Sequence, residues 1–220
     1  MKTVVITGAG GNLGAAASHH FLGKGWRVLA FVSPGKVPGG KKDNLTYVEA
    51  DLMDEAGTAE VLASVMKKHP VIDAAILTVG GFEAGGLEQT DDAALRRMYA
   101  LNFETAYHVA RPLSLWMNRQ PEGGRIIFIG ARPALDASAG KSLVAYGLSK
   151  SLLFKLAEYM DSAFVKVKAH VVVFSALDTP QNRASMPKAD RSQWVAPERV
   201  AELMEEVVTR GGNEIVEIRN

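Results

Sequence analysis

The stretch MKTVVITGAGGNLG, residues 1–14, decides the fold of this chain. It places a short apolar run, residues 4–6, directly before a glycine-rich turn, and a helical pattern over residues 15–22 follows. Parallel sheets use such a strand, glycine turn and helix to present backbone N–H groups to a pyrophosphate at the helix N-terminus. The stretch therefore predicts a dinucleotide-binding α/β fold, and a glycine-rich turn that binds no ligand is the alternative.

The glycines of this turn have separate expected roles. Gly8 permits the tight turn, Gly10 or Gly11 lets the backbone approach a pyrophosphate, and Gly14 allows the helix to pack closely on the strand. The predicted cofactor-binding residues of the turn are Gly8, Gly10, Gly11, Asn12, Leu13 and Gly14.

Compact runs rich in valine and isoleucine recur along the rest of the chain, at residues 4–6, 28–32, 74–77, 126–129 and 171–174. Runs that do not alternate with polar residues are typical of strands buried on both faces. Helical spacing fills the segments between them, at residues 13–24, 54–69, 91–118, 143–164 and 197–210. The alternation predicts a single Rossmann-type domain over residues 1–220, a doubly wound parallel sheet with helices on both faces.

Three segments carry further expectations. Residues 214–218 mix polar and apolar side chains, which suits an edge strand, and Pro112 should kink the helix of residues 91–118. Residues 179–194 follow the carboxyl end of a strand, where ligands sit in α/β sheets, and we expect them to form a substrate loop.

Composition excludes several classes of protein. A formal charge of +1 over 220 residues favours no polyanion, so we expect no nucleic-acid partner. The absence of cysteine excludes disulfides, zinc–thiolate sites and cysteine nucleophiles. The five histidines lack ligand-like spacing, so we expect no metal. No apolar run is long enough for a signal peptide or a membrane span, which leads us to expect a cytoplasmic protein without membrane contact.

Tyr146 and Lys150 form the strongest catalytic candidate. Residues four apart on a helix share one face, with Cβ atoms about 5–6 Å apart. An ammonium beside a phenol favours the phenolate and lowers the phenol pKa, so the pair can donate and accept a proton near neutral pH. So short a motif also arises by chance on an exposed helix face.

These motifs together resemble the short-chain dehydrogenase/reductase family. The resemblance rests on the N-terminal glycine turn, the pair Asp51-Leu52 after the third strand, Asn102 in a central helix and the Tyr146–Lys150 motif. Within that family the chain looks most similar to the dihydropteridine reductases, above all over residues 177–194. The resemblance implies an NAD(P)H-dependent oxidoreductase that acts on a small molecule and forms a homodimer through the Tyr146 helix.

The same resemblance implies a role for each catalytic candidate. Tyr146 would deliver a proton as nicotinamide delivers a hydride, and Lys150 would hold the nicotinamide ribose. Asn102 would bind a water of the proton relay, unless it is a helix-interior amide that satisfies the backbone.

Further residues would contact the cofactor. Asp51, with Leu52, would lie at the adenine, unless Asp51 caps the following helix. The Gly80-Gly81 turn would pass under the adenosine ribose. Thr179 would touch the carboxamide or diphosphate, or else cap a turn.

The strand of residues 126–129 departs from the family. Most members place a serine at its end to polarise the substrate carbonyl, whereas this chain has Gly130 and Ala131 there. Ser138 and Ser142 lie downstream and could replace this donor if the chain loops back. Loss of such a donor typically costs about 3 kcal/mol of transition-state stabilisation. An enzyme without it needs an easily reduced substrate such as a quinonoid dihydropterin, and dihydropteridine reductases also resemble this chain in having alanine there.

The end of the second strand, where the adenosine ribose would bind, also departs from the pattern of NAD enzymes. NAD enzymes usually carry an acid at the end of the second strand, whereas this chain has Ser33 there and no acid before Asp43. Ser33 and Lys36 could hold a ribose 2′-phosphate, which favours NADP(H) slightly, although the dihydropteridine reductases are associated with NADH.

The substrate contacts are predicted at Phe82, Ala131 and Trp194. Phe82 would stack on a flat heterocycle or else belong to the core. Two other functions stay open: a carbonyl reductase whose substrate the sequence does not specify, and a dinucleotide-binding sensor without redox activity.

Overall fold

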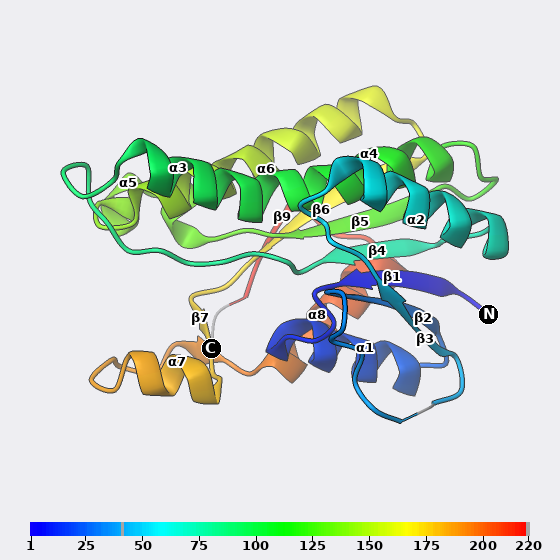
Figure 1. Ribbon diagram of the computed structural model, residues 1–220, viewed down its shortest axis with the longest axis horizontal. Coiled ribbons are helices and arrows are strands. Elements are labelled where there is room, and N and C mark those ends of the chain that lie inside the picture. The colour runs from blue at the N-terminus through cyan, green and yellow to red at the C-terminus, as the bar shows by residue number, and fades with distance from the viewer. Residues whose placement is uncertain (41, 219–220) are drawn as a thin grey trace.

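A computed structural model of the protein describes residues 1–40 and 42–218 and confirms the doubly wound α/β architecture (Figure 1). Its central sheet has seven strands, all paired in parallel. In spatial order these are β3 (Leu45–Glu49), β2 (Arg27–Val32), β1 (Thr3–Thr7), β4 (Ala74–Leu77), β5 (Gly124–Ile129), β6 (Val167–Val173) and β9 (Ile215–Glu217).

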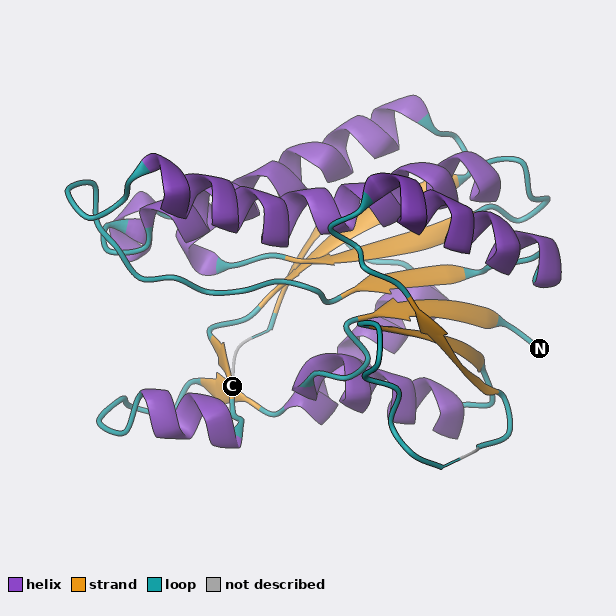
Figure 2. Ribbon diagram, viewed as in Figure 1, coloured by secondary structure: helices purple, strands orange, loops and turns teal. Residues whose placement is uncertain are grey.

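The apolar runs of the sequence become strands because both sheet faces are covered by helices (Figure 2). Val4 and Ile6 pack on the face of α1 (Asn12–Gly23) and α8 (Pro197–Arg210). Val5, which points the opposite way, packs on the face of three further helices. These helices are α2 (Glu55–Lys68), α4 (Thr105–Met117) and α6 (Val144–Ala163).

The order of the strands reverses between β1 and β4. The chain winds outward from β1 to β2 and β3, and then returns to β4 on the other side of β1. The Thr78 amide donates to the Thr7 hydroxyl (3.1 Å), and the Thr78 hydroxyl donates to the Thr7 carbonyl (2.7 Å). The turns that leave β1 and β4 are thereby joined at the switch point where doubly wound sheets bind ligands.

The predicted helix of residues 91–118 is interrupted. It comprises α3 (Asp92–Tyr99), a π-helical segment η1 (Ala100–Glu104) and α4. Pro112 lies inside α4, so the change in hydrogen-bonding pattern comes well before the residue expected to disturb the helix. Segments of π-helix are rare and occur frequently at functional sites.

Residues 179–194 contain the short helix α7 (Pro180–Ser185) and begin the strand β8 (Trp194–Val195), which pairs with β7 (Ala176–Leu177). The predicted edge strand is confirmed as β9, beside β6. Two further short elements, η2 (Arg132–Ala134) and α5 (Ala137–Gly140), connect β5 to α6. In the part of the chain that the structure describes, no helix has the length and apolar character needed to cross a membrane.

Candidate active site

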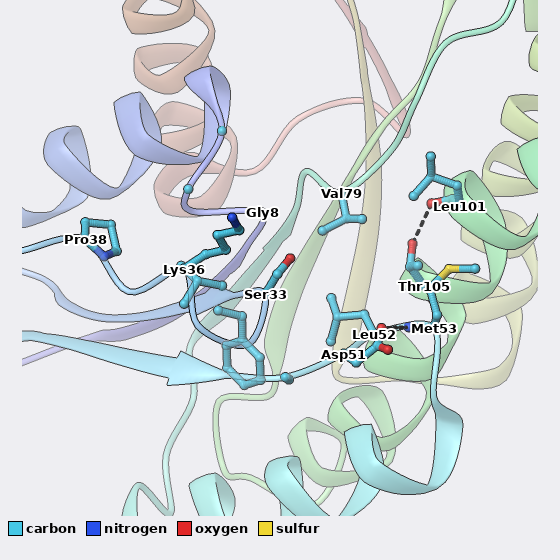
Figure 3. A pocket seen from close by; sticks show the side chains of 15 residues that line it. Gly8, Ser33, Lys36, Pro38, Asp51, Leu52, Met53, Val79, Leu101 and Thr105 are labelled. Atoms are coloured by element: carbon cyan, nitrogen blue, oxygen red, sulfur yellow. Dashed lines mark hydrogen bonds between the residues drawn. The ribbon is translucent and has the colours of Figure 1, made fainter.

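A cleft of about 480 Å³ opens at the switch point between β1 and β4 (Figure 3). The predicted cofactor residues that line it are Gly8, Gly10, Gly11, Ser33, Lys36, Asp51 and Leu52. Its other lining residues are Phe31, Val32, Pro38, Ala50, Met53, Val79, Leu101 and Thr105, of which only Val79 belongs to a turn expected at the cofactor. Most of these are apolar, and a cofactor cleft with apolar walls and a few placed polar groups is the usual arrangement.

The glycines of the N-terminal turn divide into two groups. Gly8 has φ +65°, and a β-carbon there would lie 2.7 Å from the Thr78 hydroxyl. A β-carbon on Gly14 would overlap the Gly8 carbonyl, so helix α1 packs on the turn only with glycine at this position. Gly10 differs, because its β-carbon would meet nothing within 4 Å. Gly8 and Gly14 are required by the fold, whereas Gly10 leaves open space in the cleft.

Helix α1 begins directly after Gly10 and Gly11, which line the cleft. The N-cap of this helix is Gly11, which has no side chain to cap them, so the first amides lack the partner that serine or aspartate would supply. Such a helix end favours an anion. Leu13 is buried in the core, which leaves its backbone rather than its side chain for the predicted contact.

The Ser33–Lys36 segment is a tight turn at the other end of the cleft. The Lys36 amide donates to the Ser33 carbonyl (3.0 Å), and Gly35 has φ +71°, as in a type II turn with Pro34 before the glycine. In Figure 3 the Lys36 side chain extends towards the glycine turn.

An acid missed in the sequence supports this turn. Glu49 accepts a hydrogen bond from the Gly35 amide (2.6 Å). The residue lies far along the chain from the end of β2, but the β2–β3 register pairs it with Val32. Only knowledge of that register would have brought Glu49 to this site.

Asp51 lies at the rim of the cleft. Its carboxylate accepts from the Met53 amide (3.0 Å), and Asp54 rather than Asp51 caps α2, through the Ala56 amide. The capping alternative for Asp51 is therefore wrong. Its contact with adenine stays a prediction.

Tyr146 and Lys150 lie on the first turns of α6. Lys150 is 5% exposed, and its ammonium donates to the Ile129 carbonyl at the end of β5 (2.8 Å). Burial disfavours charge on both groups, so it lowers the pKa of Lys150 to about 8 and raises the pKa of Tyr146 to about 12. The expected lowering of the tyrosine pKa is absent because burial dominates. At neutral pH the phenol stays protonated, as a proton donor must be.

Asn102 joins this pair from segment η1. Its side chain is fully buried, its oxygen accepts from the Gly81 amide (2.8 Å), and its nitrogen donates to the Ser149 hydroxyl (3.0 Å). A β-carbon on Gly80 would lie 2.6 Å from the Asn102 oxygen and 3.2 Å from the Lys150 ammonium. The structure thus brings Asn102, Lys150 and the Gly80-Gly81 turn together. The Asn102 amide does satisfy backbone, and its part in a water relay stays a prediction.

The three predicted substrate residues differ in their exposure to solvent. Phe82 is exposed and packs edge-on against Tyr146, with ring centroids 5.2 Å apart, so it is not a core residue. Ala131 is buried at the end of β5. Trp194 is also buried, with the Arg191 guanidinium over its ring, and its contact with substrate stays a prediction.

The two residues that follow β5, Gly130 and Ala131, have no side-chain donor. A β-carbon on Gly130 would lie 2.6 Å from Val171 and 2.8 Å from Phe154, so this position has no room for serine. The Ser138 hydroxyl donates to the Asp136 carboxylate (2.9 Å), which uses its one proton.

The segment of residues 179–194 touches the start of helix α1. Thr179 caps α7 by accepting a hydrogen bond from the Asn182 amide (3.2 Å). The capping role that was the alternative for this residue is therefore confirmed. The Asn12 side chain donates to the Gln181 side chain (3.1 Å). Helix α7 therefore lies beside the start of α1. Within residues 1–40 and 42–218, no group of three or more acidic or histidine side chains has the arrangement of a metal site.

Comparisons with known proteins point to one family. The family model described as short chain dehydrogenase matches residues 2–190. A dihydropteridine reductase from Dictyostelium discoideum is 24% identical over 212 residues, which cover 92% of this chain and 86% of that protein. A 2,3-dihydro-2,3-dihydroxybenzoate dehydrogenase from Escherichia coli is 26% identical over 187 residues, covering 83% and 72%.

Solved structures show the same fold. A short-chain type dehydrogenase/reductase from Mycobacterium ulcerans superimposes with a TM-score of 0.87 at 21% identity, over 98% of this chain and 87% of that one. ElxO with NADP bound superimposes with a TM-score of 0.84 at 18% identity, over 99% and 96%.

Proposed function

The chain belongs to the short-chain dehydrogenase family, and we propose that this oxidoreductase reduces a flat, electron-poor heterocycle of the quinonoid dihydropterin type. The observation that carries the proposal is a Tyr146–Lys150 pair combined with Gly130 and Ala131 after β5, where most family members carry a serine. A carbonyl substrate needs such a donor to stabilise its developing oxyanion, whereas a quinonoid ring is reduced readily without one. The similarity to a dihydropteridine reductase agrees with this choice.

The residues of the cleft fit a nicotinamide dinucleotide. Open space at Gly10 and uncapped amides at the start of α1 suit a pyrophosphate, and Lys36, which lines the same cleft, is the cation we assign to a ribose phosphate. When bound, the reduced cofactor supplies the hydride. Tyr146 supplies the proton from its protonated phenol, Lys150 holds positive charge beside the ribose, and Phe82 covers the substrate ring.

Oxidation of NADPH and NADH by a chemically generated quinonoid pterin tests this function. Tyr146→Phe should lower turnover about 10²-fold or more, because a positioned proton donor contributes about 10²–10⁴-fold. Tyr159→Phe, on the exposed side of the same helix, is the matched control and should keep full activity. Faster turnover of aldehydes or ketones would indicate a carbonyl reductase, and cofactor binding without turnover of any acceptor would indicate a sensor.

We propose NADP(H) as the preferred cofactor, because Ser33 and Lys36 line the cleft and the carboxylate of Glu49 is engaged by the Gly35 amide. Lys36→Ala should weaken NADPH binding about tenfold, the loss expected for one charge-assisted hydrogen bond, and leave NADH binding unchanged. Lys42→Ala is the control from the same loop. Equal affinity of wild type for the two cofactors would contradict the preference.

We propose that the enzyme is a homodimer formed through α6 and its neighbour α3. Exposed apolar side chains gather on these helices and line a groove of about 410 Å³ between them; they include Leu95, Tyr99, Leu148 and Leu152. Contiguous apolar surface of this kind marks protein interfaces. Leu152→Asp should shift the sedimentation of the protein from dimer to monomer, whereas Val165→Asp, at an exposed site beyond α6, should not.

A further inference from the structure

A chain of three hydrogen bonds links helix α6 to the turn that leaves β4. The Gly81 amide donates to the Asn102 oxygen (2.8 Å), the Asn102 nitrogen donates to the Ser149 hydroxyl (3.0 Å), and that hydroxyl donates to the Tyr146 carbonyl (2.8 Å). Asn102 is fully buried and Ser149 is 3% exposed, so water does not compete for these bonds.

The direction of every proton in this chain is fixed by its two ends. The Gly81 amide can only donate and the Tyr146 carbonyl can only accept. Because Ser149 has a single hydroxyl proton and gives it to Tyr146, it can only accept from Asn102. Asn102 must therefore turn its nitrogen to Ser149 and its oxygen to Gly81.

The Asn102 nitrogen has a second, weaker acceptor. It lies 3.7 Å from the sulfur of Met98, which is a weak acceptor. If the amide rotated, its NH2 group would face the Gly81 amide, donor against donor. It would also come beside the Lys150 ammonium, which shares with the Asn102 oxygen the space next to Gly80.

We propose that Ser149 is a positioning residue that sets the orientation of the Asn102 amide and thereby holds the Gly80-Gly81 turn against Lys150. This inference rests on the proposed function only for its kinetic consequence. The hydrogen-bond relation itself is independent of which substrate the enzyme takes.

The direct test is amide hydrogen exchange at Gly81. Ser149→Ala should speed exchange of this amide about five- to tenfold, the factor expected for loss of one hydrogen bond. Ser151→Ala is a matched control, because Ser151 makes the same bond to the carbonyl three residues earlier on α6 (2.7 Å) but is half-buried at the groove between α3 and α6 and has no bond to Asn102 among the described residues. Should Ser149→Ala fail to fold, Ser149→Cys keeps the size of the side chain and weakens only its hydrogen bonding, and faster Gly81 exchange is expected there too. Unchanged exchange would overturn the proposal.

The kinetic test is a double-mutant cycle. Ser149→Ala should lower kcat about tenfold while the Kd for NADPH stays within twofold, and it should have no further effect in an Asn102→Ala background. An equal loss of kcat in both backgrounds would mean that Ser149 acts apart from Asn102, and would overturn the proposal. If wild type turns over no acceptor, the proposed function fails, and the exchange of Gly81 still decides the role of Ser149.

Discussion

The two ends of the proposed cofactor path are built in opposite ways. Around Lys150, Asn102 and Ser149 the polar groups are buried and bonded to one another or to the ends of strands. Around Ser33 and Lys36 a surface turn is held to the sheet by the single carboxylate of Glu49. In the proposed binding mode, the chemical step therefore takes place in a closed, preorganised network, whereas recognition of the adenosine end depends on an open loop. Substitutions should have larger effects at the first end than at the second.

The largest effect is expected from the charge on Lys150. Its pKa is about 8 in the folded protein and 10.5 as a free side chain, so between these values the unfolded chain holds a proton that the folded chain has released. Wild type should therefore gain about 2.5 kcal/mol of stability relative to Lys150→Met as the pH rises from 7 to 10. Urea unfolding of both proteins at several pH values measures this gain.

Lys141→Met, at an exposed site, should leave the pH dependence of stability unchanged. If the free energies of unfolding of wild type and Lys150→Met changed with pH in parallel, the ammonium would be well solvated. The network around Lys150 would then be accessible to water.

Gly80→Ala tests how tightly the buried end is packed. The added methyl would press on the Asn102 oxygen and the Lys150 ammonium, so the free energy of unfolding should fall by about 1–3 kcal/mol. Gly23→Ala, where a β-carbon meets nothing within 4 Å, should be neutral. Equal stability of the two variants would show that the network around Lys150 and Asn102 is not tightly packed, which would contradict its contrast with the surface turn at Ser33 and Lys36.

Gly10→Ala probes the cleft between the two ends. Because its methyl group meets no protein atom, stability should change by less than about 0.5 kcal/mol. The methyl group fills the space where the backbone would approach a pyrophosphate, so NADPH should bind about tenfold more weakly in a calorimetric titration. Gly14→Ala should instead destabilise the fold, and unchanged NADPH affinity in Gly10→Ala would place the pyrophosphate elsewhere.

Glu49 should give the smallest effect. Glu49→Ala removes the acceptor of the Gly35 amide and should weaken NADPH binding about two- to fivefold, whereas Glu49→Gln retains an acceptor and should stay near wild type. Glu60→Gln, in α2, controls for charge alone. An equal loss of affinity in both Glu49 variants would assign the effect to the charge and not to the hydrogen bond.

Most of the fold was predictable because its determinants are local. The apolar runs at residues 28–32 and 126–129 form β2 and β5. The glycine turn connects β1 to α1, as the apolar run before it and the helical pattern after it predicted. Burial on both faces makes such runs easy to recognise.

The site was predictable only in part, because several of its contacts join distant segments. Glu49 reaches Gly35 through strand register, and Ser149 meets Asn102 across two helices. The effect of Lys150 on Tyr146 was expected from spacing alone, and burial, which spacing does not reveal, changed the direction of the pKa shift.

The π-helical segment η1 joins α3 and α4 into one continuous helix whose two halves pack against different parts of the molecule. Ahead of it, Ala94 and Met98 of α3 pack towards α6, and after it Val109 and Leu113 of α4 pack on the sheet. A π turn takes one residue more than an α turn, and one residue corresponds to about 100° of rotation. Deleting a single residue from η1 would therefore swing either α3 or α4 by about a quarter turn, so this segment should tolerate substitution far better than a change in its length.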